Sequence, residues 1–245
     1  MKFAGILKKL GVILIFLLVW QLFSSSIIPP PTEVVIAGIQ SFDILISDTF
    51  ISLTRVFIGF ILASILGFFV GLALYQSNML NDLFSPLIDL LRPISPVAWV
   101  PIAIMWFGIG NNPAFFLVGL GVFFPVFTNT YEALRLVKKS YLYVAKNLGA
   151  SKFKIITKVL VPAAMPQIIT GLRIGLGVGW MALITAELVG ATSGLGYMIQ
   201  LNRMLLQTEN VILGMVVIGI MGYIMNKIML TYEAKITRWR NESIS

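Results

Sequence analysis

The sequence contains no cysteine and no histidine, and its 10 acidic residues occur singly along the chain. Without cysteine the protein forms no disulfide and has no thiolate nucleophile. Without histidine it lacks the most common metal ligand and the most common proton shuttle. The scattered acids offer no acid–base or metal cluster of the kind that an enzyme needs. The composition therefore argues against an enzyme and predicts no bound cofactor or metal.

A nucleotide-binding loop is also missing. The pattern G-x-x-x-x-G-K-[ST], whose backbone amides cradle nucleotide phosphates, does not occur in the sequence. Any ATP that drives this protein must therefore be bound and hydrolysed by a partner.

Charged residues are scarce, at 11% of the chain, whereas hydrophobic residues make up 58%. Mean hydropathy is +0.94. In a typical soluble domain about a quarter of the residues are charged. Several apolar runs also exceed the roughly 18 residues that indicate a membrane-spanning helix. These features predict an all-α integral membrane protein.

The apolar runs predict six membrane-spanning helices. They are expected over residues 11–28, 50–75, 83–107, 114–134, 163–189 and 211–230. Prolines 86, 93, 96 and 101 interrupt the third run, so a broken helix is expected there, buried in protein or lining water. Residues 191–209 are too short and too polar to span.

The first run has a second interpretation, because a secretory signal peptide also has a basic start and an apolar core. The only candidate for its cleavage site is the serine triplet 24–26, which is not a clear small-x-small site. We favour a retained first span that stops at the three prolines 29–31.

Lysine and arginine are concentrated at the amino end, in the loop 135–162 and in the C-terminal tail. The segments 32–49, 108–113 and 190–209 carry only Arg203 between them. Basic loops stay on the cytoplasmic side of a membrane. The distribution predicts a multi-pass protein of the cell membrane with both termini in the cytoplasm. The net charge of +8 follows from this topology, so it does not indicate nucleic-acid binding.

Small residues recur at every fourth position in two of the predicted spans. They are Gly59, Ala63, Gly67 and Gly71 in the second span, and Gly171, Gly175 and Gly179 in the fifth. Such a face lets another helix approach closely in lipid, so both faces are expected to pack helices within or between subunits.

The segment from Ser140 to Pro162 stands out because it is basic between two apolar runs. Its pattern predicts two short helices joined by a hinge. The apolar stripe of the first helix is Tyr141, Val144, Ala145 and Leu148, and that of the second is Phe153, Ile156 and Leu160. Gly149 suits the left-handed residue that closes a helix, and Ser151 can cap the next one. Pro162 is expected to end the second helix and to open the following one.

This segment resembles the cytoplasmic loop of permeases of ATP-driven importers. That loop has the pattern E-A-A, three residues, Gly, nine residues, I-x-L-P. The corresponding positions here are Tyr143-Val144-Ala145, Gly149, and Val159, Val161 and Pro162. The spacing, the second alanine, the glycine and the proline match, whereas the glutamate, the first alanine, the isoleucine and the leucine are replaced. The alternative is an ordinary basic amphipathic loop lying on lipid headgroups.

The resemblance extends over roughly residues 52–230, to permeases of the nitrate/sulfonate/taurine importer group. It rests on several motifs in the right order, at 52–60, 91–101, 106–110, 171–173, 180–191 and 194–196. It implies the type I ABC importer permease fold, with a homodimer, two ABC ATPase subunits and a separate solute-binding protein. On this resemblance we divide the chain into an N-terminal helix and external loop (1–48), a core (49–232) and a cytoplasmic tail (233–245).

In that family the first short helix of the loop inserts into a cleft on the ATPase. The resemblance therefore assigns the coupling role to Tyr143, Val144, Ala145, Leu148, Gly149 and Pro162. It also implies a small anionic substrate such as a sulfonate, taurine or nitrate, although related permeases carry vitamins or their precursors. A secondary transporter without an ATPase is a further alternative, but no clear internal repeat supports it.

Ionisable residues inside spans are candidates for the translocation pathway, or for an ion pair that is broken during the transport cycle. Four stand out: Asp89, Arg92, Arg173 and Glu187. In a purely structural alternative, Asp89 and Arg92 pair with each other at i, i+3, and Arg173 extends its charge toward the inner interface. Glu187 has no evident local partner. Arg55 and Arg203, near the outer face, are compatible with an anionic substrate.

Overall fold

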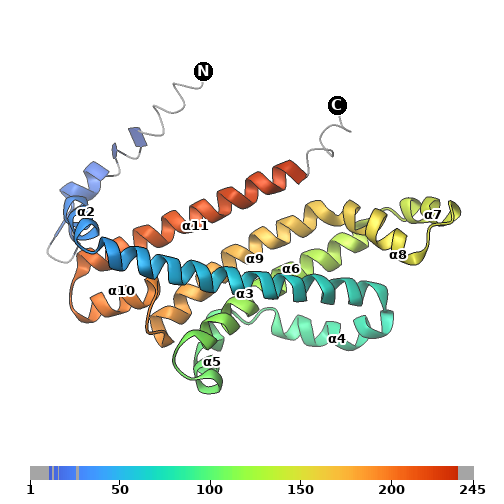
Figure 1. Cartoon of the computed structure of the whole chain (residues 1–245), viewed down its shortest axis with the longest axis horizontal. Coiled ribbons are helices and arrows are strands. Elements are labelled where there is room, and N and C mark those ends of the chain that lie inside the picture. The colour runs from blue at the N-terminus through green and yellow to red at the C-terminus, as the bar shows by residue number, and fades with distance from the viewer. Residues whose placement is uncertain (1–10, 13, 16, 26–27, 237–245) are drawn as a thin grey trace.

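The computed structural model describes residues 11–12, 14–15, 17–25 and 28–236, and over these residues every regular element is a helix. The elements are α2 (Pro31–Gln40), α3 (Phe42–Gln76), α4 (Asn78–Leu91), η1 (Pro96–Trp99), α5 (Val100–Phe107), α6 (Asn111–Leu136), α7 (Lys139–Asn147), α8 (Lys152–Ile155), η2 (Ile156–Leu160), α9 (Val161–Gly190), α10 (Leu195–Met204) and α11 (Thr208–Ile236). Figure 1 shows the long helices side by side, with α7 and α8 at one end and α10 at the other.

Five of the six predicted spans have a counterpart among the described residues. The helices α3, α6, the run Lys152–Gly190 and α11 are long and apolar enough to cross a membrane. The third predicted span is the pair formed by α4 and the segment Pro96–Phe107, bent by 87°. This confirms that the prolines break it. Of the first predicted span, the described residues between 11 and 22 are helical, residues 23–25 and 28 are not helical, and residues 13, 16, 26 and 27 lie outside the described part of the chain.

The second span differs from its prediction, because its helix begins at Phe42 rather than near residue 50. The segment expected to be an external loop is mostly helical as well, since Pro31 starts α2. With 35 residues, α3 is about 52 Å long. The hydrocarbon core of a bilayer is only about 30 Å thick. The acidic first turns of α3 therefore extend beyond the apolar layer, which is why hydropathy alone assigned them to a loop.

Pro162 does not end a helix, so that prediction was wrong. The helical run continues from Lys152 to Gly190, and Pro162 lies in the first turn of α9, as expected for a helix-opening proline. The transition is the π-helical segment η2, where the Val161 N–H donates to the Ile156 carbonyl. A π-turn inserts one extra residue into the helix and changes its local pairing. The proline, which has no N–H, is thereby accommodated without a break.

Helix α6 is the central element of the bundle, because the small-residue face of α3 and that of α9 both pack against it. A methyl group added at Gly67 of α3 would lie 3.0 Å from the Phe123 carbonyl oxygen of α6. One added at Gly179 of α9 would lie 2.6 Å from Cγ2 of Val122, also in α6. The predicted close packing is confirmed, and in this chain both partners are the same helix.

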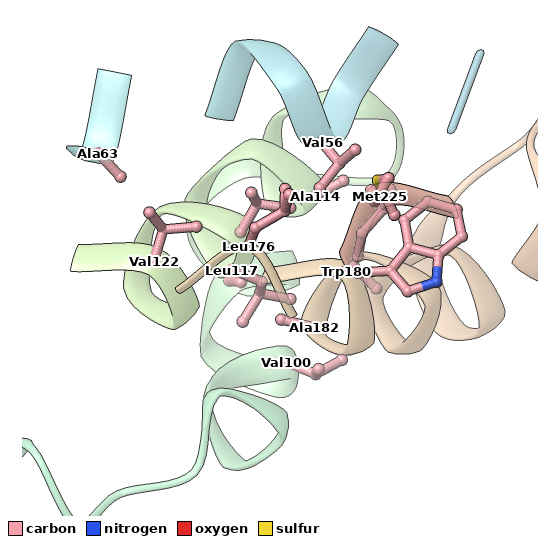
Figure 2. Packing of buried hydrophobic residues seen from close by; sticks show 14 of the residues in the cluster. Val56, Ala63, Val100, Ala114, Leu117, Val122, Leu176, Trp180, Ala182 and Met225 are labelled. Carbon is pink, nitrogen blue, oxygen red and sulfur yellow. The ribbon is translucent and has the colours of Figure 1, made fainter. Parts of the chain in front are cut away.

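The main apolar core lies where α3, α5, α6, α9 and α11 meet. Figure 2 shows Val56 of α3, Leu117 and Val122 of α6, and Leu176 and Trp180 of α9 in this cluster. Trp180 is buried, and its indole N–H donates to the Ile218 carbonyl of α11 at 3.3 Å. The core fixes the spans to one another, so that the loops at either end are held by a rigid frame.

The close approach of α6 and α9 can be tested with two glycines of α9. We expect Gly179→Leu to lower the free energy of unfolding by about 2–3 kcal/mol, because the new side chain must push α6 away. Gly177→Leu is the matched control, since nothing lies within 4 Å of a methyl group added at Gly177. Chemical denaturation of both variants in mild detergent measures the difference. Equal stability of the two variants would contradict the packing described here.

Candidate functional site: the coupling segment and the buried ion pairs

The hinge between α7 and α8 has the conformation that the sequence predicted. Gly149 has a φ of +76°, the left-handed region that costs other residues about 1–2 kcal/mol. Its N–H donates to the Lys146 carbonyl at 3.0 Å, and the Ala150 N–H donates to the Ala145 carbonyl at 3.0 Å. These two bonds form a Schellman motif, which satisfies the last carbonyls of α7. The glycine therefore fixes the direction in which the chain leaves α7.

The second short helix is capped as predicted and is anchored to the bundle. The Ser151 hydroxyl accepts a hydrogen bond from the Lys154 N–H at 3.4 Å. Ile156 and Leu160 pack in a cluster with Leu134 at the end of α6. Phe153 belongs to the same predicted stripe but is 74% exposed, so it does not pack against the bundle.

Helix α7 presents an exposed apolar surface beyond the ends of the spans. Tyr143, Val144 and Leu148 are 63%, 57% and 82% exposed, and Ala145 is half-buried. On another side of the helix, Leu142 packs against the same cluster as Leu160 and so attaches α7 to the bundle. Exposed apolar surface of this kind is typical of a protein-interaction site.

Glu187, near the C-terminal end of α9, is buried, and its partner comes from a distant part of the chain, which agrees with the prediction that it has no local partner. Its Oε1 lies 2.7 Å from Nη1 of Arg55 in α3, and the two side chains are 0% and 4% exposed. The Ser52 hydroxyl donates to its Oε2 at 2.8 Å, and the Gly196 N–H donates to the same oxygen at 3.0 Å. In this conformation the Glu187 side chain is enclosed by protein.

Arg55 uses all five of its N–H groups in this network. Nη1 donates to Glu187 and to the Ser193 carbonyl at 2.7 Å. Nη2 donates to the Ser193 hydroxyl, and Nε and Nη2 both donate to Oδ1 of Asn111 at the start of α6. A buried arginine is tolerated when its charge is paired and all its donors are satisfied. Arg55 therefore ties α3, α6, α9 and the α9–α10 loop together, and it is a structural residue.

The α9–α10 loop approaches Glu187 closely because of its glycines. Gly194 has a φ of +104°, and a methyl group added there would overlap the Glu187 carboxylate. The Gly194 N–H donates to Asp48 at 2.8 Å, and the Leu195 N–H donates to the Ser52 hydroxyl at 2.9 Å. Sequence analysis missed this network. The available signal was that Arg55 and Glu187 lie at the same predicted membrane depth with opposite charge.

Arg173 is also paired, with a residue from another span. Its Nε lies 2.9 Å from Oε2 of Glu233 in α11, and the Thr170 hydroxyl donates to Glu233 Oε1 at 2.7 Å. Sequence analysis did not predict this partner for Arg173. The pair links the middle of α9 to the C-terminal end of α11.

Asp89 and Arg92 do not pair with each other. Both are exposed, and no ion pair joins them among the described residues. Arg92 follows the last residue of α4, just before the bend, and lines a cavity of about 300 Å³ between the bend, α6 and α9. Asp89 lines a neighbouring cavity of about 210 Å³ between α4 and α6. Of the four predicted pathway residues, these two line cavities, and Arg173 and Glu187 form interhelical ion pairs.

The bundle of spanning helices, the bent third span and the helix–glycine–helix loop together define a membrane permease of the type I importer fold. The chain belongs to the binding-protein-dependent transport system inner membrane component family, which it matches over residues 59–238. It is therefore a transport component and not an enzyme. The family works with a solute-binding protein, and in its ABC members with an ATPase.

Two relatives illustrate the sequence similarity. The taurine transport system permease protein TauC of Escherichia coli is 36% identical over 96% of this chain and 90% of its own length. The bicarbonate transport system permease protein CmpB of Synechococcus elongatus is also 36% identical, over 97% of this chain and 90% of its own length. The predicted relationship to permeases of this group is thereby confirmed.

Solved structures confirm the fold. The inward-facing MetNI methionine ABC transporter aligns with a TM-score of 0.70 at 20% identity, over 81% of this chain and 98% of the matched chain. An amino acid ABC transporter determined with histidines aligns with a TM-score of 0.67 at 16% identity, over 82% and 97% of the two chains. The predicted type I importer fold is therefore correct.

Proposed function

We propose that two copies of this chain form the translocation pathway of an importer and that α7 of each copy docks into an ABC ATPase subunit. The observation that carries the proposal is the exposed apolar surface of Tyr143, Val144 and Leu148, held beyond the spans by Leu142. Two copies are proposed because an ATPase dimer offers two equivalent docking sites, and symmetric partners assemble with the same symmetry. The lysines around this surface attract an acidic partner by charge.

The connection from α7 into the membrane explains how a movement of the ATPase reaches the permease. Gly149 and Ser151 join α7 to α8, and from Lys152 the helical run continues to Gly190. A displacement of α7 is therefore passed directly to α9, which packs along α6. When ATP closes the ATPase dimer, the two loops approach each other and the spans rock from an inward-open to an outward-open arrangement.

The proposed orientation places α7, α8 and both termini in the cytoplasm, because the basic residues are concentrated there. The opposite end, with α10 and the α9–α10 loop, then faces the solute-binding protein. The proposed substrate is a small anion, which is the chemistry shared by the taurine sulfonate and bicarbonate of the two relatives.

The docking proposal is tested by purifying the chain from membranes with a C-terminal tag and identifying the bound proteins by mass spectrometry. We expect a stoichiometric ATPase subunit with the native chain. Ala145→Arg should lower the bound ATPase by about tenfold or more, because a buried unpaired charge in an apolar interface costs several kcal/mol.

Ser140→Arg is the matched control, since it places the same side chain on an exposed turn of α7 outside the apolar stripe. It should retain the ATPase. A chain that is purified alone as a stable oligomer, or an Ala145→Arg variant that binds the ATPase like the native chain, would show that α7 is not the docking element.

A further inference from the structure

Arg92 is a charged residue that the structure leaves without a partner inside the predicted third span. Among the described residues its side chain takes part in no ion pair or hydrogen bond. It lies at the bend between α4 and η1, and the cavity that it lines is bounded by the central parts of α6 and α9. An arginine within a membrane is costly unless it faces water, a partner or a ligand. The cavity is the place where such a ligand would be accommodated.

The other polar groups of this cavity come from one turn of α6. Thr128 is 8% exposed, and its hydroxyl has no hydrogen-bond partner among the described residues. Asn129, the next residue, donates from its amide to the Pro125 carbonyl at 2.9 Å, so its side chain is held in place by the proline kink. A buried hydroxyl without a partner is uncommon in folded proteins, so the Thr128 hydroxyl is free to bond to a group that enters the cavity.

The rest of the lining is apolar. It is formed by Ile94, Leu120, Phe124, Ile174 and Val178, with the prolines 96 and 125. Arg92 is the single charged residue among the described residues that line it. A volume of about 300 Å³ is at the small end of the range for small-molecule sites. The cavity therefore combines one positive charge, a hydroxyl and an amide with a short apolar wall.

Arg92 also lines a second cavity, which contains two carboxylates. The neighbouring cavity of about 210 Å³ is lined by Asp89, Glu132, Arg135 and Arg92 itself. Arg135 stacks over the Tyr131 ring, 5.5 Å from its centroid, and adds a second positive charge there. The two carboxylates are thus matched by two arginines in this neighbouring cavity. Because Arg92 and Thr128 line both cavities, the two cavities lie next to each other.

We propose that Arg92, Thr128 and Asn129 form a transient binding site for a small organic monoanion, such as an alkyl sulfonate, within the translocation pathway. The anionic head lies between the guanidinium and the Thr128 hydroxyl, and the short alkyl part lies against Phe124 and Ile174. This proposal rests on the proposed importer function and adds to it a place inside the permease where the solute is held after its release from the binding protein.

The lack of native cysteine allows a direct test, because a single introduced thiol reports on its surroundings. The native complex carrying Thr128→Cys is labelled with 2-sulfonatoethyl methanethiosulfonate, an anion, and with its trimethylammonioethyl analogue, a cation. Met79→Cys, on the exposed start of α4, is the control for intrinsic reactivity. We expect the anion-to-cation rate ratio to be about tenfold higher at position 128 than at position 79, because Arg92 attracts the anion in a poorly screened site.

The same ratio identifies the group responsible. In Thr128→Cys/Arg92→Gln it should fall to the value at position 79, and in Thr128→Cys/Arg92→Lys it should stay raised. Butane-1-sulfonate should slow labelling at position 128 and leave position 79 unchanged, whereas choline should slow neither. If Thr128→Cys does not fold, Ile94→Cys replaces it, because Ile94 lines the same cavity and is partly exposed.

A ratio at position 128 equal to that at position 79, or no protection by butane-1-sulfonate, would overturn the anion site. The labelling is read on the chain itself, so it gives this answer whether or not an ATPase co-purifies. Bound ATPase together with an absent anion preference would leave the importer function standing and refute the site alone. Anion preference and protection without any bound ATPase would refute the proposed coupling and retain the site.

Discussion

Replacing Gly149 by proline is expected to abolish solute uptake while the protein remains inserted at normal abundance. Proline fixes φ near −65°, whereas Gly149 has a φ of +76°. Proline also removes the N–H that donates to the Lys146 carbonyl. Both losses redirect the chain between α7 and α8, so the apolar surface of α7 no longer faces the ATPase in the required direction. We expect uptake into cells, normalised to membrane abundance, to fall at least about tenfold. The reason is that a backbone conformation unsuited to proline costs about 1–3 kcal/mol at the joint between α7 and α8.

Two milder substitutions at the same position serve as controls. Gly149→Asn should retain most of the uptake, because asparagine tolerates the left-handed conformation better than other residues and keeps its N–H. Gly149→Ala should be intermediate, since a methyl group at this position meets nothing within 4 Å and only the backbone conformation is strained. Normal uptake by Gly149→Pro would show that the Schellman turn has no role in coupling.

Removing Arg55 is expected to have the largest effect on stability. In Arg55→Met the buried Glu187 carboxylate loses its counter-ion, while Asn111 and Ser193 lose their donors. Removing one partner of a buried ion pair costs about 3–5 kcal/mol. The free energy of unfolding, measured by chemical denaturation in mild detergent, should fall by that amount. The control is Arg203→Met, since Arg203 is exposed at the end of α10 and its loss should change stability by less than about 0.5 kcal/mol.

The double variant Arg55→Met/Glu187→Met separates the ion pair from the packing. It removes both charges together, so the double variant should be more stable than the sum of the two single effects predicts, by about 2 kcal/mol or more. Strict additivity of the two substitutions would mean that the buried carboxylate and the guanidinium do not stabilise each other, which would contradict the network described here.

Local chemistry explains the parts of the fold that were predicted correctly. The hinge follows from residues that act on their own neighbours: Gly149 takes the left-handed conformation and Ser151 caps the next helix, whatever surrounds them. Prolines remove backbone donors wherever they occur in a span, so the break in the third span is a local effect as well. Hydropathy located the other spans because the bilayer selects long apolar helices.

Sequence analysis did not predict the ends of the helices or the π-turn. Hydropathy marks the apolar layer, whereas α3 continues beyond it through Asp43 and Asp48. Pro162 removes a donor, but the π-turn before it changes which carbonyl each N–H reaches. The position of Pro162 therefore does not decide where the helix stops.

The sequence by itself determined that this chain spans a membrane, where its third span breaks and how its coupling segment turns, because each depends on residues close together in the chain. Tertiary structure alone decided that Arg55 pairs with Glu187 across 132 positions and that Arg173 pairs with Glu233. It also decided that Arg92 faces a cavity and does not pair with Asp89. A stripe of glycines shows that some helix approaches closely, but not which one. Only the arrangement of spans around α6 brings charges of equal depth side by side, and Coulomb attraction in a poorly hydrated layer then selects the pairs.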